Sequence, residues 1–108
     1  RDPAFGLLLV LGVGGTQAEL FPAVNAAVLP TVSSRIAAMI DSHPVLSRLL
    51  AGYRGAEAGN RDALIDVVQR FAQWGLDHGD ELLEADVNPV MVNGTGAVAV
   101  DARAVFGR

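Results

Sequence analysis

The sequence has no cysteine and no lysine among its 108 residues, and only 6% of them are aromatic. Without cysteine, a disulfide scaffold, a zinc–thiolate site and a thiol nucleophile are excluded. The longest apolar run begins at Leu7 and ends at Val13, far short of the ~20 residues that a membrane helix needs. The start of the chain carries no signal-peptide pattern. We therefore expect a cytoplasmic protein, and the missing initiator methionine suggests that the chain is cut from a longer one.

Positive charge is scarce and scattered. All eight cations are arginines, against twelve acidic residues, so the formal net charge is −4. Binding to nucleic acid or to an anionic membrane needs clustered cations, so neither is expected as a partner. Apolar residues make up 51% of the chain, which excludes intrinsic disorder, and the length suits one domain, residues 1–108.

The apolar pattern predicts strands at both ends of the chain and helices between them. The expected strands are Leu7–Val13, Gln17–Leu20, Asn25–Leu29, Leu82–Val92 and Ala97–Phe106. The expected helices are Ser33–Asp41, Val45–Leu50 after Pro44, and Arg61–Leu76 with Asn60 as its N-cap and Gly79 as its stop. This order predicts an α+β fold, with a mixed, mostly antiparallel sheet and helices on one face.

Three ring-bearing side chains are expected to be structural. Trp74 is assigned to the core or its rim, because large aromatic residues are usually buried. His43 precedes Pro44 and His78 precedes Gly79, so both are expected to be surface turn residues. With no cysteine and no paired histidine, a zinc site is not expected.

The C-terminal hairpin brings together polar residues whose register depends on its turn. If Gly94-Thr95 is the two-residue loop, Asn88 faces Asp101 and Asp86 faces Arg103. If Asn93-Gly94 is the loop, Asp86 faces Asp101 and Asn88 lies diagonal. Either even-length loop leaves the four side chains on one face of the sheet, and an odd-length loop or a bulge would separate them.

Two carboxylates, an amide oxygen and a guanidinium stand in strands that are otherwise apolar. Mg²⁺ and Mn²⁺ favour such an oxygen-only set, completed by substrate phosphates. The alternative is an Asp–Arg ion pair on a solvated sheet face. From the pattern alone both interpretations stay open.

The glycines that follow the first strand allow two interpretations. Gly12-Val13-Gly14-Gly15 could cradle phosphate through its backbone N–H groups, or could form a tight turn. The segment matches neither the dinucleotide fingerprint nor the P-loop, since Gln17 stands at a required glycine position and no lysine follows. Glu19 lies in an apolar stretch and is expected to be buried or to face a site.

Five segments follow one another along the chain: Asp2-Pro3-Ala4-Phe5-Gly6, Gly12-Val13-Gly14-Gly15-Thr16-Gln17-Ala18-Glu19, Leu50-Ala51-Gly52-Tyr53-Arg54-Gly55, Glu84-Ala85-Asp86-Val87-Asn88-Pro89 and Val100-Asp101-Ala102-Arg103. In this order they resemble motifs of the NDP-forming acyl-CoA synthetases, whose ATP-grasp domain is also fused to some acetyltransferase-like proteins. The resemblance implies the C-terminal half of an ATP-grasp domain, with a lid half that would precede Arg1.

The resemblance also implies roles for site residues, with Mg²⁺ or Mn²⁺ and ATP or ADP as cofactors. Asn88 and Asp101 match the metal ligands, and Asp86 matches an acidic position near the phosphohistidine loop. Glu19 joins Asp86 as a candidate catalytic residue. The implied nucleotide-binding positions are Arg103, Arg54, Gly14 and Gly15.

Two positions depart from the family pattern. Ala23 and Ala27 stand where the family typically has an Asp and an Arg. We therefore weigh two functions. One is a fragment of an acid–CoA ligase that works with nucleotide and with the CoA-binding, phosphohistidine-bearing part of its parent protein. The other is a binding or assembly module without chemistry, and self-association is left open.

Overall fold

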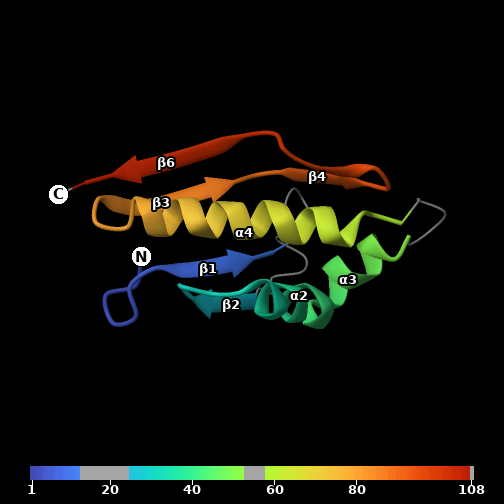
Figure 1. The fold of residues 1–108 in the computed structure, drawn as a ribbon, viewed down its shortest axis with the longest axis horizontal. Helices are drawn as coiled ribbons and strands as arrows, with labels where there is room; N and C mark the ends of the chain where they lie inside the picture. The colour runs from blue at the N-terminus through green and yellow to red at the C-terminus, as the bar shows by residue number, and fades with distance from the viewer. Residues whose placement is uncertain (13–24, 53–57, 108) are drawn as a thin grey trace.

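The fold combines helices with short antiparallel ladders (Figure 1). The computed structural model describes residues 1–12, 25–52 and 58–107. In these ranges three helices accompany three two-stranded ladders, and all three ladders are antiparallel. The α+β prediction is confirmed, although no hydrogen-bonded ladder joins the three pairs within the described part. The strand expected at Gln17–Leu20 lies outside the described residues.

The first ladder pairs β1 (Leu8–Leu11) with β2 (Asn25–Val28). A tight turn precedes β1, in which Asp2 and Gly6 form an antiparallel bridge. The Asp2 carboxylate accepts hydrogen bonds from the backbone N–H groups of Ala4 and Phe5, at 2.8 and 3.0 Å. Gly6 has a φ of +78°, a conformation that residues with a Cβ rarely adopt. This turn fixes how the chain enters β1.

The helices are α2 (Ser33–Ser42), α3 (Pro44–Leu50) and α4 (Arg61–Asp77), close to the predicted ranges. The predicted N-cap of α4 is confirmed, because the Asn60 side-chain oxygen accepts from the backbone N–H of Ala63 at 3.0 Å. The helix ends at Asp77, two residues before Gly79, and His78 is its C-cap. No helix in the described ranges has the length and apolar character needed to span a membrane.

The core lies where α2 and α4 pack together against β1. Ile36, Met39 and Ile40 are almost completely shielded from solvent. The three residues are spaced i, i+3 and i+4, which places them on one face of α2. The full set of buried apolar side chains in this cluster is Leu9, Ile36, Met39, Ile40, Leu64, Val68 and Ala72.

His43 is buried, so its prediction as a surface turn residue is wrong. Its exposed fraction is 1%. The ring nitrogen Nδ1 accepts a hydrogen bond from the backbone N–H of Leu46 at 3.1 Å, which caps α3. Pro44 correctly predicted the start of a helix. It did not reveal that the side chain that caps this helix, His43, would be buried. His78 is exposed, as expected, and its ring lies 4.9 Å from that of Trp74.

The C-terminal hairpin consists of β3 (Leu82–Val87), β4 (Val90–Asn93), β5 (Gly96–Ala99) and β6 (Ala102–Phe106). Asn93 faces Gly96, so Gly94 and Thr95 form the two-residue loop. The Asn93 side-chain oxygen accepts from the backbone N–H groups of Thr95 and Gly96, at 2.9 and 3.1 Å, which fixes this turn. Of the two registers considered, the structure has the one centred on Gly94-Thr95.

The hairpin departs from simple alternation at two places. Leu83 is an extra residue between the pairs Leu82–Phe106 and Glu84–Val105, and this bulge lets Leu82 face the core. Farther along, Val87 and Val90 are both half-buried, while Asn88 and Pro89 between them are both exposed. The alternation of buried and exposed side chains is therefore interrupted at Asn88-Pro89, between β3 and β4.

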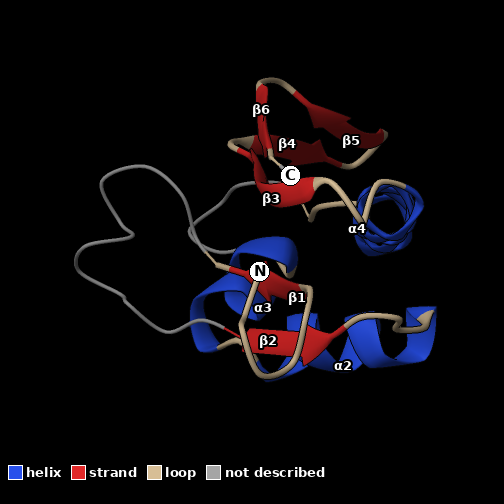
Figure 2. Cartoon of the chain, turned by 90° about the vertical axis from the view of Figure 1, so that its left-hand side faces the viewer, coloured by secondary structure: helices blue, strands red, loops and turns tan. Residues whose placement is uncertain are grey.

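Seen along the strands, β3, β1 and β2 follow one another, and α4 lies to one side of them (Figure 2). The ring of Trp74 on α4 lies 6.1 Å from that of Phe71 and 6.1 Å from that of Phe106 on β6. Trp74 is half-buried, which agrees with its prediction as a core or rim residue. Through the contact between Trp74 and Phe106, the hairpin packs against α4.

Candidate functional site

The polar residues of the hairpin gather where β3 ends and β6 begins. The backbone N–H of Asn88 donates to the carbonyl oxygen of Asp101 at 3.0 Å, so these two residues are direct cross-strand neighbours. Asp86 faces Arg103 two pairs farther along, beyond the pair Val87–Ala102. Both pairings agree with the register predicted for the Gly94-Thr95 loop. All four side chains are exposed and accessible to a ligand.

Arg103 is held by two carboxylates. Its Nη1 lies 3.1 Å from Oε1 of Glu84 and 3.6 Å from Oδ2 of Asp86. The three side chains are each more than half exposed, so the pairs add little stability. One guanidinium faces two carboxylates here, and Asp101 lies close by. The local charge is therefore negative.

Sequence reasoning did not single out Glu84 as a contributor to this cluster. It stands two residues before Asp86, and alternation along a strand puts both on the same face. That two-residue spacing in the sequence could have identified Glu84 as a member of the cluster. In the structure Glu84 makes the shorter contact to Arg103, so any ligand that recruits this arginine competes with both acids.

Four of the predicted site residues lie outside the described residues. These are Gly14, Gly15, Glu19 and Arg54. The structure therefore does not relate them to the hairpin, and their roles stay predictions.

The donor set suits a cation that draws most of its ligands from elsewhere. Over residues 1–12, 25–52 and 58–107, no three His, Cys, Asp or Glu side chains cluster as a metal site would. Asn88 and Asp101 instead offer one amide and one carboxylate oxygen from adjacent strands. Mg²⁺ typically binds one or two carboxylates and fills its other positions with water and phosphate oxygens. The residues present fit such a sparse site.

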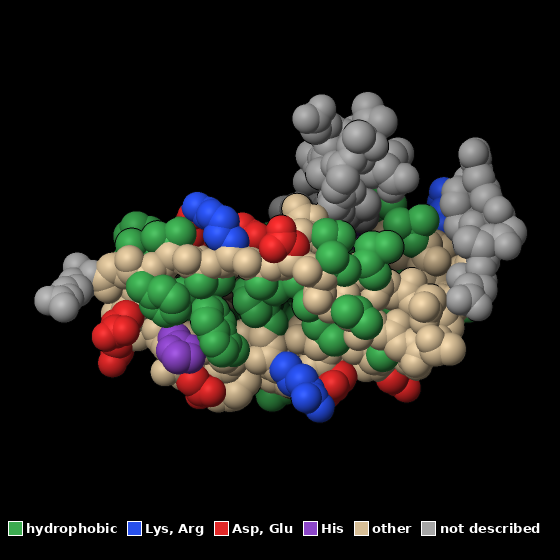
Figure 3. Space-filling view, turned by 90° about the horizontal axis from the view of Figure 1, so that it is seen from above, with side chains coloured by type: hydrophobic (Ala, Val, Ile, Leu, Met, Phe, Trp, Pro, Cys, Tyr) green, Lys and Arg blue, Asp and Glu red, His purple; other side chains and the backbone are tan. Residues whose placement is uncertain are grey.

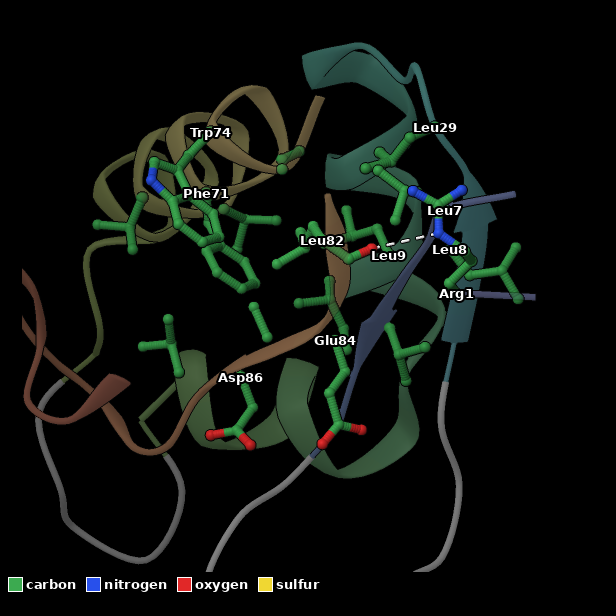
Figure 4. A pocket seen from close by; sticks show the side chains of 18 of the residues that line it. Arg1, Leu7, Leu8, Leu9, Leu29, Phe71, Trp74, Leu82, Glu84 and Asp86 are labelled. Carbon is green, nitrogen blue, oxygen red and sulfur yellow. Dashed lines mark hydrogen bonds between the residues drawn. The ribbon is translucent and has the colours of Figure 1, made fainter. Parts of the chain in front are cut away.

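A groove of about 550 Å³ lies beside this cluster. Its walls are β1 and β3, and its floor is α4 with Phe71 and Trp74 (Figure 4). Glu84 and Asp86 lie together at one end, and Arg1 donates from Nε to the carbonyl oxygen of Leu82 on β3 (Figure 4). Asn88 and Asp101 do not line it. The groove and the candidate metal ligands are therefore neighbouring but separate features.

The outer surface of the hairpin is part charged and part apolar. Arginine and acidic side chains lie together along one edge in the view from above, next to apolar side chains (Figure 3). On β4 and β5 the cross-strand pair Met91 and Val98 is 59% and 64% exposed, and Val100 beside it is 59% exposed. This apolar patch adjoins Asn88 and Asp101 along the chain.

The described helices and antiparallel ladders define an α+β domain, and its C-terminal hairpin carries the candidate oxygen donors Asn88 and Asp101. A family model described as ATP-grasp domain matches residues 1–106. The chain belongs to this ATP-grasp family, which confirms the family resemblance of the sequence.

Curated relatives are similar over nearly the whole chain. Acetate–CoA ligase [ADP-forming] I of Archaeoglobus fulgidus is 36% identical over 107 residues, which are 99% of this chain and 15% of the relative. The beta subunit of acetate–CoA ligase [ADP-forming] II of Pyrococcus furiosus is 34% identical over 98% of this chain and 45% of the relative. The chain thus spans less than half the length of either relative.

A solved structure is similar in fold as well as in sequence. Acetyl-coenzyme A synthetase 1 of Candidatus Korarchaeum cryptofilum, in complex with coenzyme A and Mg-AMPPCP, superposes with a TM-score of 0.89 at 34% identity. The match covers 99% of this chain and 49% of that one. The described fold is therefore that of about half of the solved chain.

Proposed function

We propose that this chain is part of an ADP-forming acid–CoA ligase and supplies the floor on which the metal–nucleotide complex rests. The observation that carries the proposal is the Asn88–Asp101 pair, two exposed oxygen-bearing residues directly opposed in the hairpin of an ATP-grasp domain. The names of the relatives, which are ADP-forming ligases of acetate and CoA, support the class of reaction.

In this proposal Asn88 and Asp101 hold Mg²⁺ or Mn²⁺ together with the phosphates of ATP or ADP. When bound, the cation would neutralise phosphate charge during phosphoryl transfer. Asp86 would act beside the phosphohistidine loop of the parent protein. Arg103 would contact phosphate after leaving Glu84 and Asp86, which hold it in the present structure.

The second candidate function is a binding or assembly module that keeps the fold without the chemistry. Ala23 and Ala27 favour it, because they stand where the resembled family typically has an Asp and an Arg. The two functions differ in one measurable property. A working site couples metal to nucleotide, and a silent module does not.

The test uses paramagnetic broadening by substoichiometric Mn²⁺ in NMR spectra of the 108-residue chain, with and without ADP. This measurement detects weak binding and reports its location. If the proposal holds, Mn²⁺ with ADP broadens the amide signals of Asn88 and Asp101 first. Asp101→Asn should remove most of that broadening, because a neutral amide attracts a hard cation less than a carboxylate does.

Asp80→Asn is the matched control, since Asp80 is an exposed aspartate in the turn before β3. It should leave the broadening at Asn88 unchanged. Broadening that is indifferent to ADP would favour the silent module. Broadening that is centred on the acidic residues of α4, or that survives in Asp101→Asn, would refute the assignment of the metal ligands.

A further inference from the structure

The turn at the tip of the hairpin carries the dipeptide Asn93-Gly94, and Asn93 is the one asparagine of the sequence that is followed by glycine. Asn93, Gly94 and Thr95 are all exposed, so water reaches the turn. The tip lies beside the start of α4 (Figure 1), where the backbone N–H of Asn60 donates to the carbonyl oxygen of Asn93 at 2.8 Å. This asparagine is therefore accessible and also links two elements of the fold.

The Asn93 side chain is folded forward along the turn. Its Oδ1 accepts from the backbone N–H of Thr95 at 2.9 Å, from the hydroxyl of Thr95 at 2.7 Å and from the backbone N–H of Gly96 at 3.1 Å. All of these donors lie beyond Gly94 in the chain, so the carboxamide curls over the next peptide unit, as it does in an Asx turn. The carboxamide carbon, Cγ, therefore lies on the Gly94 side of the asparagine, from which a ring closure starts.

The same three donors make the carboxamide more reactive. A carbonyl oxygen that accepts several hydrogen bonds draws electron density from its carbon, and the donors stabilise the negative charge that the oxygen gains during attack. The distances to Oδ1 fall in the range of about 2.7–3.1 Å that is typical of donors to an oxyanion. Gly94 has no Cβ to hinder the approach of its own nitrogen. Asn93 thus combines a polarised carboxamide with an unhindered neighbouring residue.

The three other asparagines lack this combination. Asn88 precedes Pro89, whose ring nitrogen carries no hydrogen. Asn60 uses its side-chain oxygen as the N-cap of α4. The Asn25 carboxamide donates from Nδ2 to a backbone carbonyl oxygen in the last turn of α2 at 2.6 Å, which directs it away from its own peptide unit. These three side chains are internal controls within one molecule.

We propose that Asn93 is a site of spontaneous deamidation, which the turn both promotes and accommodates. The backbone nitrogen of Gly94 attacks Cγ of Asn93, so a bond forms between these two atoms and the bond from Cγ to Nδ2 breaks. Ammonia leaves with the hydrogen of the glycine nitrogen, and a cyclic succinimide remains. The reaction needs no reagent other than water for the next step. The proposal is independent of metal and nucleotide binding.

Water opens the succinimide at either of its two carbonyl carbons. Cleavage of the bond between Cγ and the Gly94 nitrogen restores the main chain and leaves an aspartate in place of Asn93. Cleavage at the main-chain carbonyl carbon instead routes the backbone through the former side chain and leaves an isoaspartate. In both cases the water supplies a hydroxyl to the carbon and a hydrogen to the nitrogen. Each product adds one carboxylate to a chain whose formal net charge is −4.

The turn accommodates the aspartate better than the isoaspartate. A carboxylate oxygen in the place of Oδ1 keeps the donors at Thr95 and Gly96, and hydrogen bonds to an ionised acceptor are the stronger kind. In the isoaspartate the main chain is longer by one carbon atom between Asn93 and Gly94. The main-chain carbonyl that accepts from Asn60 is then part of a carboxylate outside the main chain. We therefore expect the isoaspartate to loosen the hairpin tip from α4.

The experiment ages the 108-residue chain in mildly alkaline buffer below its Tm and follows the products by peptide mass spectrometry. The reference is the free peptide Val-Asn-Gly-Thr-Gly, which has the sequence of residues 92–96. Asn93 should convert in the chain at least as fast as in the peptide, while the other three asparagines stay unchanged. Conversion of the peptide without conversion of the chain, or equal conversion at another asparagine, would overturn the proposal.

Two variants test the roles of the neighbouring residues. Gly94→Ala should slow the conversion by about tenfold or more, which corresponds to about 1.4 kcal/mol in the barrier, because its methyl group hinders the attacking nitrogen. Thr95→Val retains the branched shape but removes the hydroxyl donor, and it should also slow the conversion. Thr31→Val, outside the hairpin, is the matched control and should leave the rate unchanged. A faster rate in Thr95→Val would show that the turn restrains Asn93 and would refute its promoting role.

The variant Asn93→Asp tests the product directly. Its Tm near neutral pH should equal or exceed that of the parent chain, because the carboxylate keeps the three donors of the turn. The isoaspartate fraction of the aged protein, separated by chromatography, should unfold at a lower temperature than the aspartate fraction. A lower Tm in Asn93→Asp than in the parent chain would show that the turn does not accept the carboxylate and would count against the proposal.

Discussion

Arg61 at the start of α4 holds Asp41 at the end of α2 through two hydrogen bonds. Nε lies 2.9 Å from Oδ1 and Nη2 lies 2.7 Å from Oδ2. This paired geometry joins the two helices that form most of the core. The hydrogen bond from Arg61 is the main cause that lowers the pKa of the Asp41 carboxyl below its ordinary value.

Asp41→Asn should destabilise the protein near neutral pH and have no effect in strong acid. A lowered pKa in the folded state contributes stability above the unfolded pKa, about 3.9, and that contribution is lost as pH falls through the folded value. Urea unfolding of both proteins between about pH 7 and pH 2 should therefore give curves that converge at the acid end.

Asp66→Asn is the control for this prediction. Asp66 pairs with Arg70 one turn along the same helix, so its loss removes no link between helices. We expect a smaller change in stability at neutral pH than for Asp41→Asn. An Asp41→Asn effect that persists unchanged below pH 3 would show that the side chain acts through something other than its charge.

His43→Ala should lower the free energy of unfolding by about 1–3 kcal/mol, since it removes a helix cap and leaves a small cavity. The ring is buried and its Nδ1 accepts from the N–H of Leu46. His43→Asn, which retains a capping oxygen, should recover part of the loss. Urea unfolding measures both. If His43→Asn were no better than His43→Ala, the cap would contribute little.

Ile36→Ala should be among the most damaging single substitutions, at about 2–5 kcal/mol. Ile36 has no exposed surface and lies among the side chains that join α2 to α4. Val98→Ala removes methyl groups from an exposed position of β5 and should stay within about 0.5 kcal/mol of the parent protein. Calorimetric Tm values that rank these two variants in the opposite order would contradict the described core.

ATP or ADP should bind the 108-residue chain no more tightly than roughly millimolar, or about −4 kcal/mol. The chain has no lysine, and Arg103 is engaged by Glu84 and Asp86. Without metal, the surrounding acids repel phosphate. Isothermal titration calorimetry at low salt is the measurement. Micromolar binding would mean that this chain holds a more complete nucleotide site than its described residues account for.

The sequence reduced the hairpin register to two alternatives but did not choose between them. Both candidate loops had an even number of residues, and the side chain of Asn93 decided between them by capping Thr95 and Gly96. Helix α4 was predictable, since its apolar stripe and its N-cap Asn60 are local signals. The family resemblance supplied the candidate ligands, which periodicity alone could not separate from an ion pair.

Other features depend on tertiary packing and carry no local signal. His43 is buried because α2 and α3 meet over it, which the residues around Pro44 do not reveal. The bulge at Leu83 arises because Leu82 must face the core while Glu84 and Asp86 face outward. The groove depends on the separation of β1 from β3, two strands far apart in the sequence.

The interrupted alternation at Asn88-Pro89 has a consequence for any ion held there. Asn88, Pro89, Val100 and Asp101 are all exposed, and backbone hydrogen bonds pair Asn88 with Asp101 and Val100 with Pro89. The apolar side chains of Pro89 and Val100 therefore stand next to the two oxygen donors, Asn88 and Asp101, along the chain. A cation at this exposed point would keep several of its waters, and the side chains of Pro89 and Val100 would border that hydration shell. Pro89→Ser or Val100→Thr would make that border polar without touching a single ligand.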